Sequence, residues 1–332
     1  MKKQSTHLPL FVLGGVVLFI LSNFIEELRV SQGTEIAYFV IAISSIILLT
    51  GYSGQVSLGH GALMAVGAYA AAVLRNEFNA PFILCFVAAV LVAALSGALL
   101  GVAAARLSGP YLAGTTLALA IALPSLATQF SILGNGQPLD FLVGPDDLSN
   151  YKWQFWIAAL AALISMWTIR NVLNSSYGRA WKAGRGNEVA AELAGINTAR
   201  SKVLAFTISA GIAGLAGALL AMTIGGPSPD AFPLAISFSL LTGAVLAGIT
   251  TLGGVIIGAV VLVAIPEVAD VVAHRLGSSE SVTTNLPGLI VSGLLILTVL
   301  FVPNGPVEQH RARKAKHEAR HTSSKKQESS KK

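Results

Sequence analysis

Residues 82–105 read FILCFVAAVLVAALSGALLGVAAA, a run of apolar and small residues without a charged side chain. A helix needs about 20 predominantly apolar residues to cross the hydrocarbon core of a bilayer. Unpaired backbone groups are costly in lipid, and this run is too uniformly apolar for the alternating strands of a membrane barrel. The stretch therefore predicts a transmembrane α-helix.

The rest of the chain has the same character. The protein has 332 residues, of which 54% are hydrophobic and 11% are charged, whereas roughly a quarter of the residues in soluble proteins are charged. This composition excludes a soluble enzyme, a nucleic-acid-binding module and a disordered scaffold. We expect an all-α integral membrane protein, a polytopic bundle of about ten spans, or eight if the short pieces are re-entrant. The predicted spans are residues 8–25, 35–50, 58–74, 82–105, 111–131, 153–172, 203–225, 234–250, 254–273 and 286–302.

Positive charges predict the orientation of these spans. Lys2 and Lys3 place the N-terminus in the cytoplasm, and ten spans then place residues 173–202 and the C-terminus there as well. With this topology, 18 of the 22 lysines and arginines lie on the cytoplasmic side. The four that face outward are Arg29, Arg75, Lys152 and Arg275.

Two regions follow from this reading. Residues 1–302 form a transmembrane domain with a cytoplasmic loop at 174–202. Residues 303–332 form a tail rich in Lys, Arg, Ser and His, with almost no apolar residues. Such a segment cannot bury a core, so we expect a basic, disordered cytoplasmic tail that at most touches lipid headgroups.

The second predicted span leads into a stretch of glycine and polar residues at 51–61, GYSGQVSLGHG. Glycines permit sharp turns, and irregular backbone at membrane depth survives only beside a cavity, so this stretch predicts a broken or re-entrant helix. Its polar side chains can line a path for a polar solute, and the candidate path residues are Ser53, Gln55, Ser57 and His60. The alternative is a hairpin whose small residues allow close packing, with His60 as a hydrogen-bonded structural residue.

The cytoplasmic loop contains a predicted short amphipathic helix. Val189, Leu193 and Ile196 recur at helical spacing on one side of it, and Glu188 and Glu192 lie on the opposite side. Asn187 can cap this helix and Gly195 can end it. Because this helix is held between two spans, we expect it to be the rigid element that a cytoplasmic partner binds. The alternative is a helix lying on the headgroups, which also suits Trp181.

Glycines three or four residues apart place small faces on several predicted helices. Such faces let helices cross closely in membranes, and we expect them to serve packing, with a sliding gate as the alternative. The pairs are Gly97 and Gly101, Gly214 and Gly217, and Gly254 and Gly258.

Other candidate sites carry less information. Glu267, Asp270 and His274 share one face of the ninth predicted span, where we expect a solvated outer helix end rather than a receptor vestibule. Ser53 and His274 stand in patterns that mimic intramembrane serine proteases, but the topology separates them by a bilayer and such a pair must meet. The single cysteine, Cys85, has no Cys or His at ligand spacing, so no metal site is expected.

Several motifs together resemble one family. The 51–61 stretch is similar to the G-Y-x-G-Q-x-S-L-G-H stretch of the permease family that carries branched-chain amino acids in bacterial ABC importers, particularly its M-type subunit. Residues 109–113, GPYLA, resemble a second signature of that family. The loop resembles the family's ATPase-docking motif through Gly178, Arg179, Asn187, Glu188, Ala190, Ala191 and Gly195. The resemblance covers most of residues 35–305.

The resemblance implies a transport subunit and not an enzyme, in a bacterial inner membrane; the charge distribution places both termini in the cytoplasm. It implies a second permease subunit, two ATPase subunits that bind ATP and Mg, and an external solute-binding protein. We expect no cofactor on this chain, which has no G-x-x-x-x-G-K-[ST] phosphate motif, and no nucleic-acid partner. Gly184 and Gly186 depart from the family, which usually has larger residues there. The alternatives are an ABC permease for urea, short amides or sugars, and an ion-gradient-driven secondary transporter.

Overall fold

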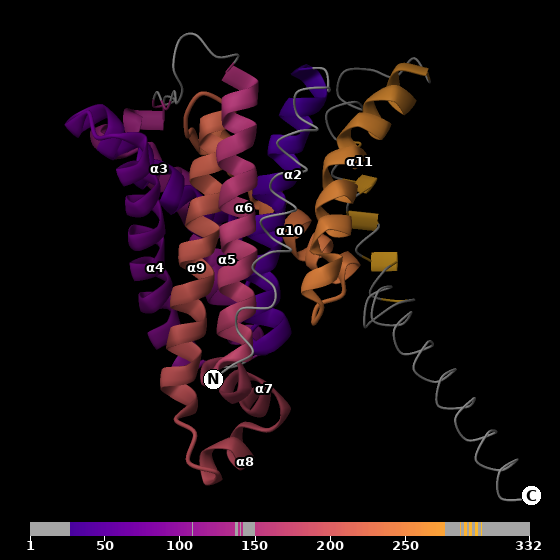
Figure 1. Ribbon diagram of the computed structural model, residues 1–332. Helices are drawn as coiled ribbons and strands as arrows, with labels where there is room; N and C mark the ends of the chain where they lie inside the picture. The colour runs from indigo at the N-terminus through magenta and orange to yellow at the C-terminus, as the bar shows by residue number, and fades with distance from the viewer. Residues whose placement is uncertain are drawn as a thin grey trace, which may run out of the picture.

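The computed structural model describes residues 27–107, 109–136, 139, 141 and 150–275, with scattered residues between 286 and 300. Within these ranges the chain is built from helices and contains no β-strand (Figure 1). The elements are α2 (Glu27–Ile46), η1 (Ile47–Tyr52), α3 (His60–Phe78), α4 (Phe82–Arg106), α5 (Pro110–Ala127), η2 (Ser131–Gly136), α6 (Asn150–Asn174), α7 (Ser176–Gly186), α8 (Glu188–Leu193), α9 (Thr198–Thr223), η3 (Pro229–Ala231), α10 (Leu234–Ala247), η4 (Leu252–Gly254) and α11 (Val255–Arg275). The predicted span 8–25, most of the predicted span 286–302 and the predicted tail 303–332 lie outside the described residues.

Seven helical segments are long and apolar enough to cross a membrane. They correspond to seven of the predicted spans and are Arg29–Tyr52, Phe82–Arg106, Pro110–Ala127, Tyr151–Asn174, Thr198–Thr223, Pro229–Ala247 and Leu252–Ala269. The predicted span 58–74 corresponds to α3, a 19-residue helix that begins at His60, carries Arg75 in its last turn and is not among these seven. The fold is that of a polytopic, all-α membrane protein.

Two helices begin five or more residues earlier than the sequence predicts. The second span begins as α2 at Glu27 instead of residue 35, and its end widens into the π-helical turn η1. α9 begins at Thr198 instead of residue 203. The Asn197 side chain accepts a hydrogen bond from the Arg200 amide at 2.9 Å, and this cap fixes the start of α9.

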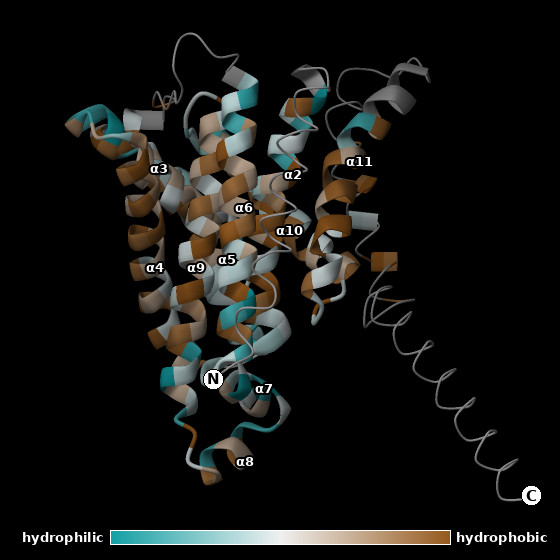
Figure 2. Cartoon of the chain, viewed as in Figure 1, coloured by the Kyte–Doolittle hydropathy of each residue, from teal (hydrophilic) through white to brown (hydrophobic). Residues whose placement is uncertain are grey.

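α4 shows how the helices face the core and the lipid. Its buried positions are small residues about four apart, namely Cys85, Ala89, Ala93, Gly97, Gly101 and Ala104. Leu91, Leu95 and Leu99 lie on its other side with 62%, 65% and 69% of their surface exposed. Figure 2 shows hydrophobic colouring along most of α4. Small residues inward and large apolar residues outward are the pattern of a helix packed on one side and covered by lipid on the other.

The predicted packing glycines lie where helices cross. A Cβ added to Gly97 would lie 2.7 Å from the Phe206 carbonyl oxygen, so α4 could not hold a larger residue this close to α9. The same added atom at the other positions would meet a neighbouring helix: Gly101 faces Val203, Gly214 faces Ala93, Gly217 faces Met64, Gly254 faces Ala247 and Gly258 faces Gly243. The contacts of Gly97, Gly101, Gly214 and Gly217 place α9 against α3 and α4 (Figure 1). Those of Gly254 and Gly258 place the start of α11 against α10.

Candidate functional site

The backbone is irregular between α2 and α3. After η1, the Ser53 amide donates to the Leu48 carbonyl and the Gln55 amide to the Leu49 carbonyl, each at 3.2 Å. Gly54 has φ +76°, which glycine adopts without the penalty that a side chain would bring. Residues 53–59 form no regular helix, and α3 begins at His60. The membrane helix is thus broken at the predicted stretch.

His60 is fully buried and both ring nitrogens have partners. Nε2 lies 3.0 Å from Ser209 Oγ, and Nδ1 lies 3.1 Å from Ser57 Oγ. Ser209 Oγ donates to the Ser45 carbonyl at 2.8 Å, so it accepts from Nε2–H, while Ser57 donates to Nδ1. One neutral tautomer therefore satisfies every group. The arrangement joins α2, α3 and α9, and it favours the structural interpretation of His60 over a solute or proton path.

The loop folds as two short helices that meet at Asn187. Asn187 Oδ1 accepts from the Ala190 amide at 3.0 Å and caps α8. Gly195 has φ +82°, and its amide donates to the Glu192 carbonyl at 2.9 Å, which ends α8. The sequence predicted the cap and the stop of α8 but not α7, whose N-terminus is capped by Ser175.

Trp181 is buried inside the protein. Its side chain is 2% exposed, and Nε1 donates to the Ser201 carbonyl at 2.9 Å. It packs in a cluster that includes Leu48 and Phe206. α7 is thus anchored to the bundle by an aromatic side chain, and the headgroup interpretation of Trp181 is wrong.

α8 presents its apolar side outward. Val189 is 66% exposed and Leu193 is 85% exposed. Its acidic side faces α9: Glu188 lies 2.5 Å from Lys202 Nζ, and Glu192 accepts a hydrogen bond from Thr198. Figure 1 shows α7 and α8 projecting beyond one end of the long helices.

α7 also contacts the broken helix. The Arg185 guanidinium donates to the Gly51 carbonyl, and Lys182 Nζ lies 5.1 Å from the centre of the Tyr52 ring. The Tyr52 hydroxyl in turn donates at 3.0 Å to the carbonyl of Thr250, in the turn between α10 and α11. We call the irregular segment at residues 51–59 the break. Side chains therefore link the cytoplasmic loop, the break and the turn between α10 and α11. The sequence analysis missed Arg185, because its partner is 134 residues away.

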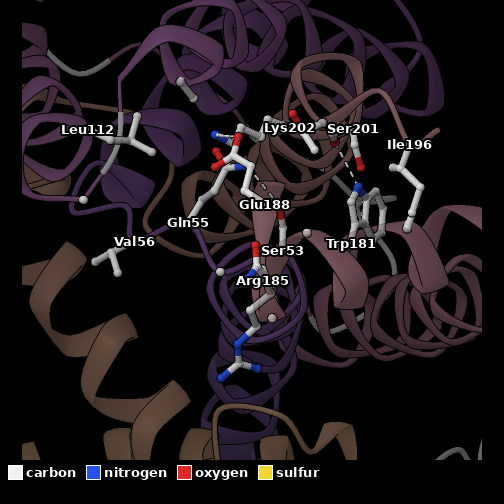
Figure 3. A pocket seen from close by; sticks show the side chains of 18 of the residues that line it. Ser53, Gln55, Val56, Leu112, Trp181, Arg185, Glu188, Ile196, Ser201 and Lys202 are labelled. Atoms are coloured by element: carbon white, nitrogen blue, oxygen red, sulfur yellow. Dashed lines mark hydrogen bonds and ion pairs between the residues drawn. The ribbon is translucent and has the colours of Figure 1, made fainter. Parts of the chain in front are cut away.

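A cavity of about 300 Å³ lies between the break, the α4–α5 turn, α7 and the start of α9. Ser53 and Gln55 line it, whereas Ser57 and His60 are not among its lining residues. Figure 3 shows Leu112 and Val56 on one side of the view, Trp181 and Ile196 on the other, and Gln55, Glu188 and Lys202 between them. The structure thus divides the four predicted path residues into two pairs.

The remaining candidates do not join this site. Gln32 Nε2 donates to Glu267 on α11, and the side chains of Asp270 and His274 lie outside the described residues. α11 begins beside the Thr250 turn that Tyr52 contacts, and His274 lies about 30 Å along it, so Ser53 and His274 cannot form a protease pair. Within the described residues, no cluster of three or more His, Cys, Asp or Glu side chains can hold a metal.

The fold and the site define a class of protein. A helical membrane bundle with a broken span beside a cavity of polar and apolar walls, joined to a projecting loop, fits a membrane transport protein. Sequence comparison then specifies which one. Residues 31–300 match the family described as the permease component of the branched-chain amino acid transport system, and this chain belongs to that family.

Three relatives illustrate the range of similarity. The high-affinity branched-chain amino acid transport system permease protein LivM of Escherichia coli K12 is 32% identical, over 83% of this chain and 70% of LivM. The corresponding permease protein LivH of Salmonella typhimurium is 30% identical, over 56% of this chain and 54% of LivH. The ribose import permease protein RbsC of Haemophilus influenzae is 24% identical, over 76% of this chain and 78% of RbsC.

Proposed function

We propose that this chain is one of two different permease subunits of an ATP-driven importer for branched-chain or other hydrophobic amino acids. An external binding protein delivers the amino acid, and two ATPase subunits bind ATP and Mg. Membership of the family and the identity to LivM support the amino-acid class, and the similarity to LivH supports a second permease as partner. The complex lies in a bacterial inner membrane with both termini and α8 on the cytoplasmic side.

The observation that carries this proposal is the exposed apolar side of α8. Glu188 and Glu192 of this six-residue helix contact α9, whereas its Val189 and Leu193 side chains are 66% and 85% exposed. Exposed apolar side chains held on a rigid element mark an interaction surface. The ATPase subunit is the partner that fits, because the importer needs a cytoplasmic motor and the loop is fixed at both ends by long helices.

Force on α8 would reach the membrane along two routes. The capped junction at Asn187 passes it to α7, whose Arg185 and Lys182 contact Gly51 and Tyr52 at the break. The ion pair between Glu188 and Lys202 passes it to α9. In this proposal the break, with Ser53 and Gln55 at its cavity, belongs to the solute path, while Ser57 and His60 hold its shape.

Uptake into liposomes tests the proposal. The complex of this chain with its partner subunits is reconstituted with ATP and Mg in the lumen and the binding protein outside. We expect uptake of labelled leucine that requires both ATP and the binding protein. Uptake of labelled ribose or urea in place of leucine would change the substrate class. Uptake driven by a proton or sodium gradient without ATP would overturn the importer.

A labelling experiment tests the orientation. Val189→Cys places a thiol on the exposed side of α8, and the natural Cys85 is fully buried and gives little background. We expect a membrane-impermeant maleimide to label this variant only from the cytoplasmic side. Labelling from outside would place α8 where no ATPase can reach it.

A further inference from the structure

A separate cavity of about 330 Å³ lies between the C-terminal end of α6, Tyr52 at the end of η1 and the turn between α10 and α11. We call it the basic pocket. Arg170 lines it, and none of the described residues that line it is acidic. The cavity beside the break differs in this respect, because Glu188 pairs with Lys202 there. The basic pocket thus has a positive charge in its wall and no negative side chain beside it in that wall.

Two further cations lie at the edge of the basic pocket, both on α7, which follows directly after α6 (Figure 1). The Arg179 guanidinium donates at 3.3 Å to the carbonyl of Asn174, and Lys182 Nζ lies 5.1 Å from the centre of the Tyr52 ring. Asn174 and Tyr52 both line the pocket. Within the part of the chain that the structure describes, neither Arg179 nor Lys182 forms an ion pair. The C-terminal end of α6 adds about half a negative charge, which these full positive charges outweigh.

The basic pocket also has apolar walls. Along α6 it extends from Asn174, which is exposed at the end of the helix, to Met166, about two turns or 12 Å further into the membrane span. Leu173 and Leu252 add apolar surface. A free phosphate ion would leave these side chains uncovered. A phospholipid carries a phosphate for the cations and acyl chains for the apolar walls, so it matches both kinds of surface.

We propose that the basic pocket binds the headgroup of an anionic phospholipid from the adjacent leaflet. The lipid phosphate faces Arg170, because a guanidinium group can donate two hydrogen bonds to phosphate oxygens. Arg179 and Lys182 attract the negative headgroup to the rim, as basic residues between membrane helices do. The first acyl carbons cover Met166 and Leu252. The bound lipid contacts α6, η1 and the turn between α10 and α11 together, so it stabilises their arrangement whichever solute the protein carries.

Lipid binding to the full-length chain in an uncharged detergent is the first test. Native mass spectrometry compares phosphatidylglycerol with phosphatidylcholine, which has the same phosphate but no net charge. Glycerol 3-phosphate, which has a phosphate but no acyl chain, is added as a competitor. We expect phosphatidylglycerol to bind at least about tenfold more tightly than phosphatidylcholine, and glycerol 3-phosphate not to displace it. Equal binding of the two lipids, or displacement by glycerol 3-phosphate, would overturn the proposal.

Variants locate the bound lipid. Arg170→Gln removes the charge in the pocket wall, and Arg106→Gln is the matched control, because Arg106 is an exposed cation beside the α4–α5 turn, at the same end of the bundle but outside the basic pocket. We expect R170Q to weaken phosphatidylglycerol binding about fivefold and R106Q to leave it unchanged. Lys182→Gln changes an exposed position, and we expect it to weaken binding about two- to fivefold even if R170Q does not fold. Unchanged binding by K182Q, or an equal loss in R106Q, would refute this site.

Thermal melting in nanodiscs is the second test. A ligand that binds only the folded state raises the melting temperature. We expect phosphatidylglycerol nanodiscs to raise the melting temperature of the wild type and of R106Q by about 2 °C or more over phosphatidylcholine nanodiscs. The rise for R170Q and for K182Q is expected to be smaller. Equal rises in all four proteins would show that the lipid stabilises the bundle without this pocket.

Discussion

Replacing Glu188 with arginine should separate coupling from stability. Glu188 begins α8 and pairs with Lys202, but 44% of its side chain is exposed. An exposed ion pair contributes about 0–1 kcal/mol, and an acidic residue in the first turn of a helix contributes about 0.3–1 kcal/mol. Even both losses together cost about 2 kcal/mol or less. These losses of free energy affect α8, which lies outside the membrane spans.

We expect E188R to reach the membrane and melt close to the wild-type temperature, yet to lose nearly all ATP-dependent uptake. Arginine places a second positive charge beside Lys202 and removes the contact that orients α8 against α9. The measurements are uptake of labelled leucine by reconstituted complex, ATP hydrolysis stimulated by the binding protein, and thermal melting in detergent.

Two variants control for the change of charge. Glu188→Gln removes the carboxylate without adding a positive charge, and we expect intermediate uptake. Glu77→Arg reverses a charge at the exposed C-terminal end of α3, where we expect wild-type uptake. Wild-type uptake by E188R would refute the reasoning, because a helix that transmits force to α9 through the Glu188–Lys202 pair could not tolerate a reversed charge at Glu188.

Three further changes test the packing, the buried histidine and the exposed face of α8. Gly217→Val drives a side chain into the Met64 backbone, and since overpacking costs about 1–3 kcal/mol, we expect a lower melting temperature than for Gly114→Val; equal melting would contradict the close crossing. His60→Ala leaves buried hydroxyls without a ring partner, at about 1–3 kcal/mol, so we expect lower stability with an unchanged pH profile of uptake per folded complex; loss of a pH step would instead indicate a proton carrier. Leu193→Ser removes an 85% exposed apolar side chain, so we expect unchanged melting and at least about tenfold weaker ATPase binding by titration; equal binding would exclude this face from docking.

Local sequence patterns predict the helices and many of their ends. Apolar runs mark the spans because a helix in lipid must pair its backbone internally, whatever its neighbours are. Asn187 and Gly195 mark the limits of α8 because a cap and a positive-φ stop depend only on adjacent residues. The early start of α2 was missed, since Glu27, Glu35 and other polar residues interrupt its apolar pattern.

Contacts between distant segments could not be predicted in this way. His60 and Ser209 are 149 residues apart, and no local periodicity indicates that α3 and α9 bring them together. For the same reason the sequence analysis grouped Ser57 and His60 with Ser53 and Gln55, although only Ser53 and Gln55 line the cavity.

The position of the break determines where a pull on the loop has its effect. The Gly51 carbonyl stands in a π-helical turn at the end of the span, and the Arg185 guanidinium donates to it. A hydrogen bond from a charged donor contributes about 1.5–3 kcal/mol, so α7 and the break should move together. Separating α3 from α9 instead would open backbone contacts at Gly67 and Gly217 along the whole crossing. We therefore expect movement of α7 to reach the irregular segment beside the cavity before it disturbs the packed core, with the core as the fixed support against which this segment moves.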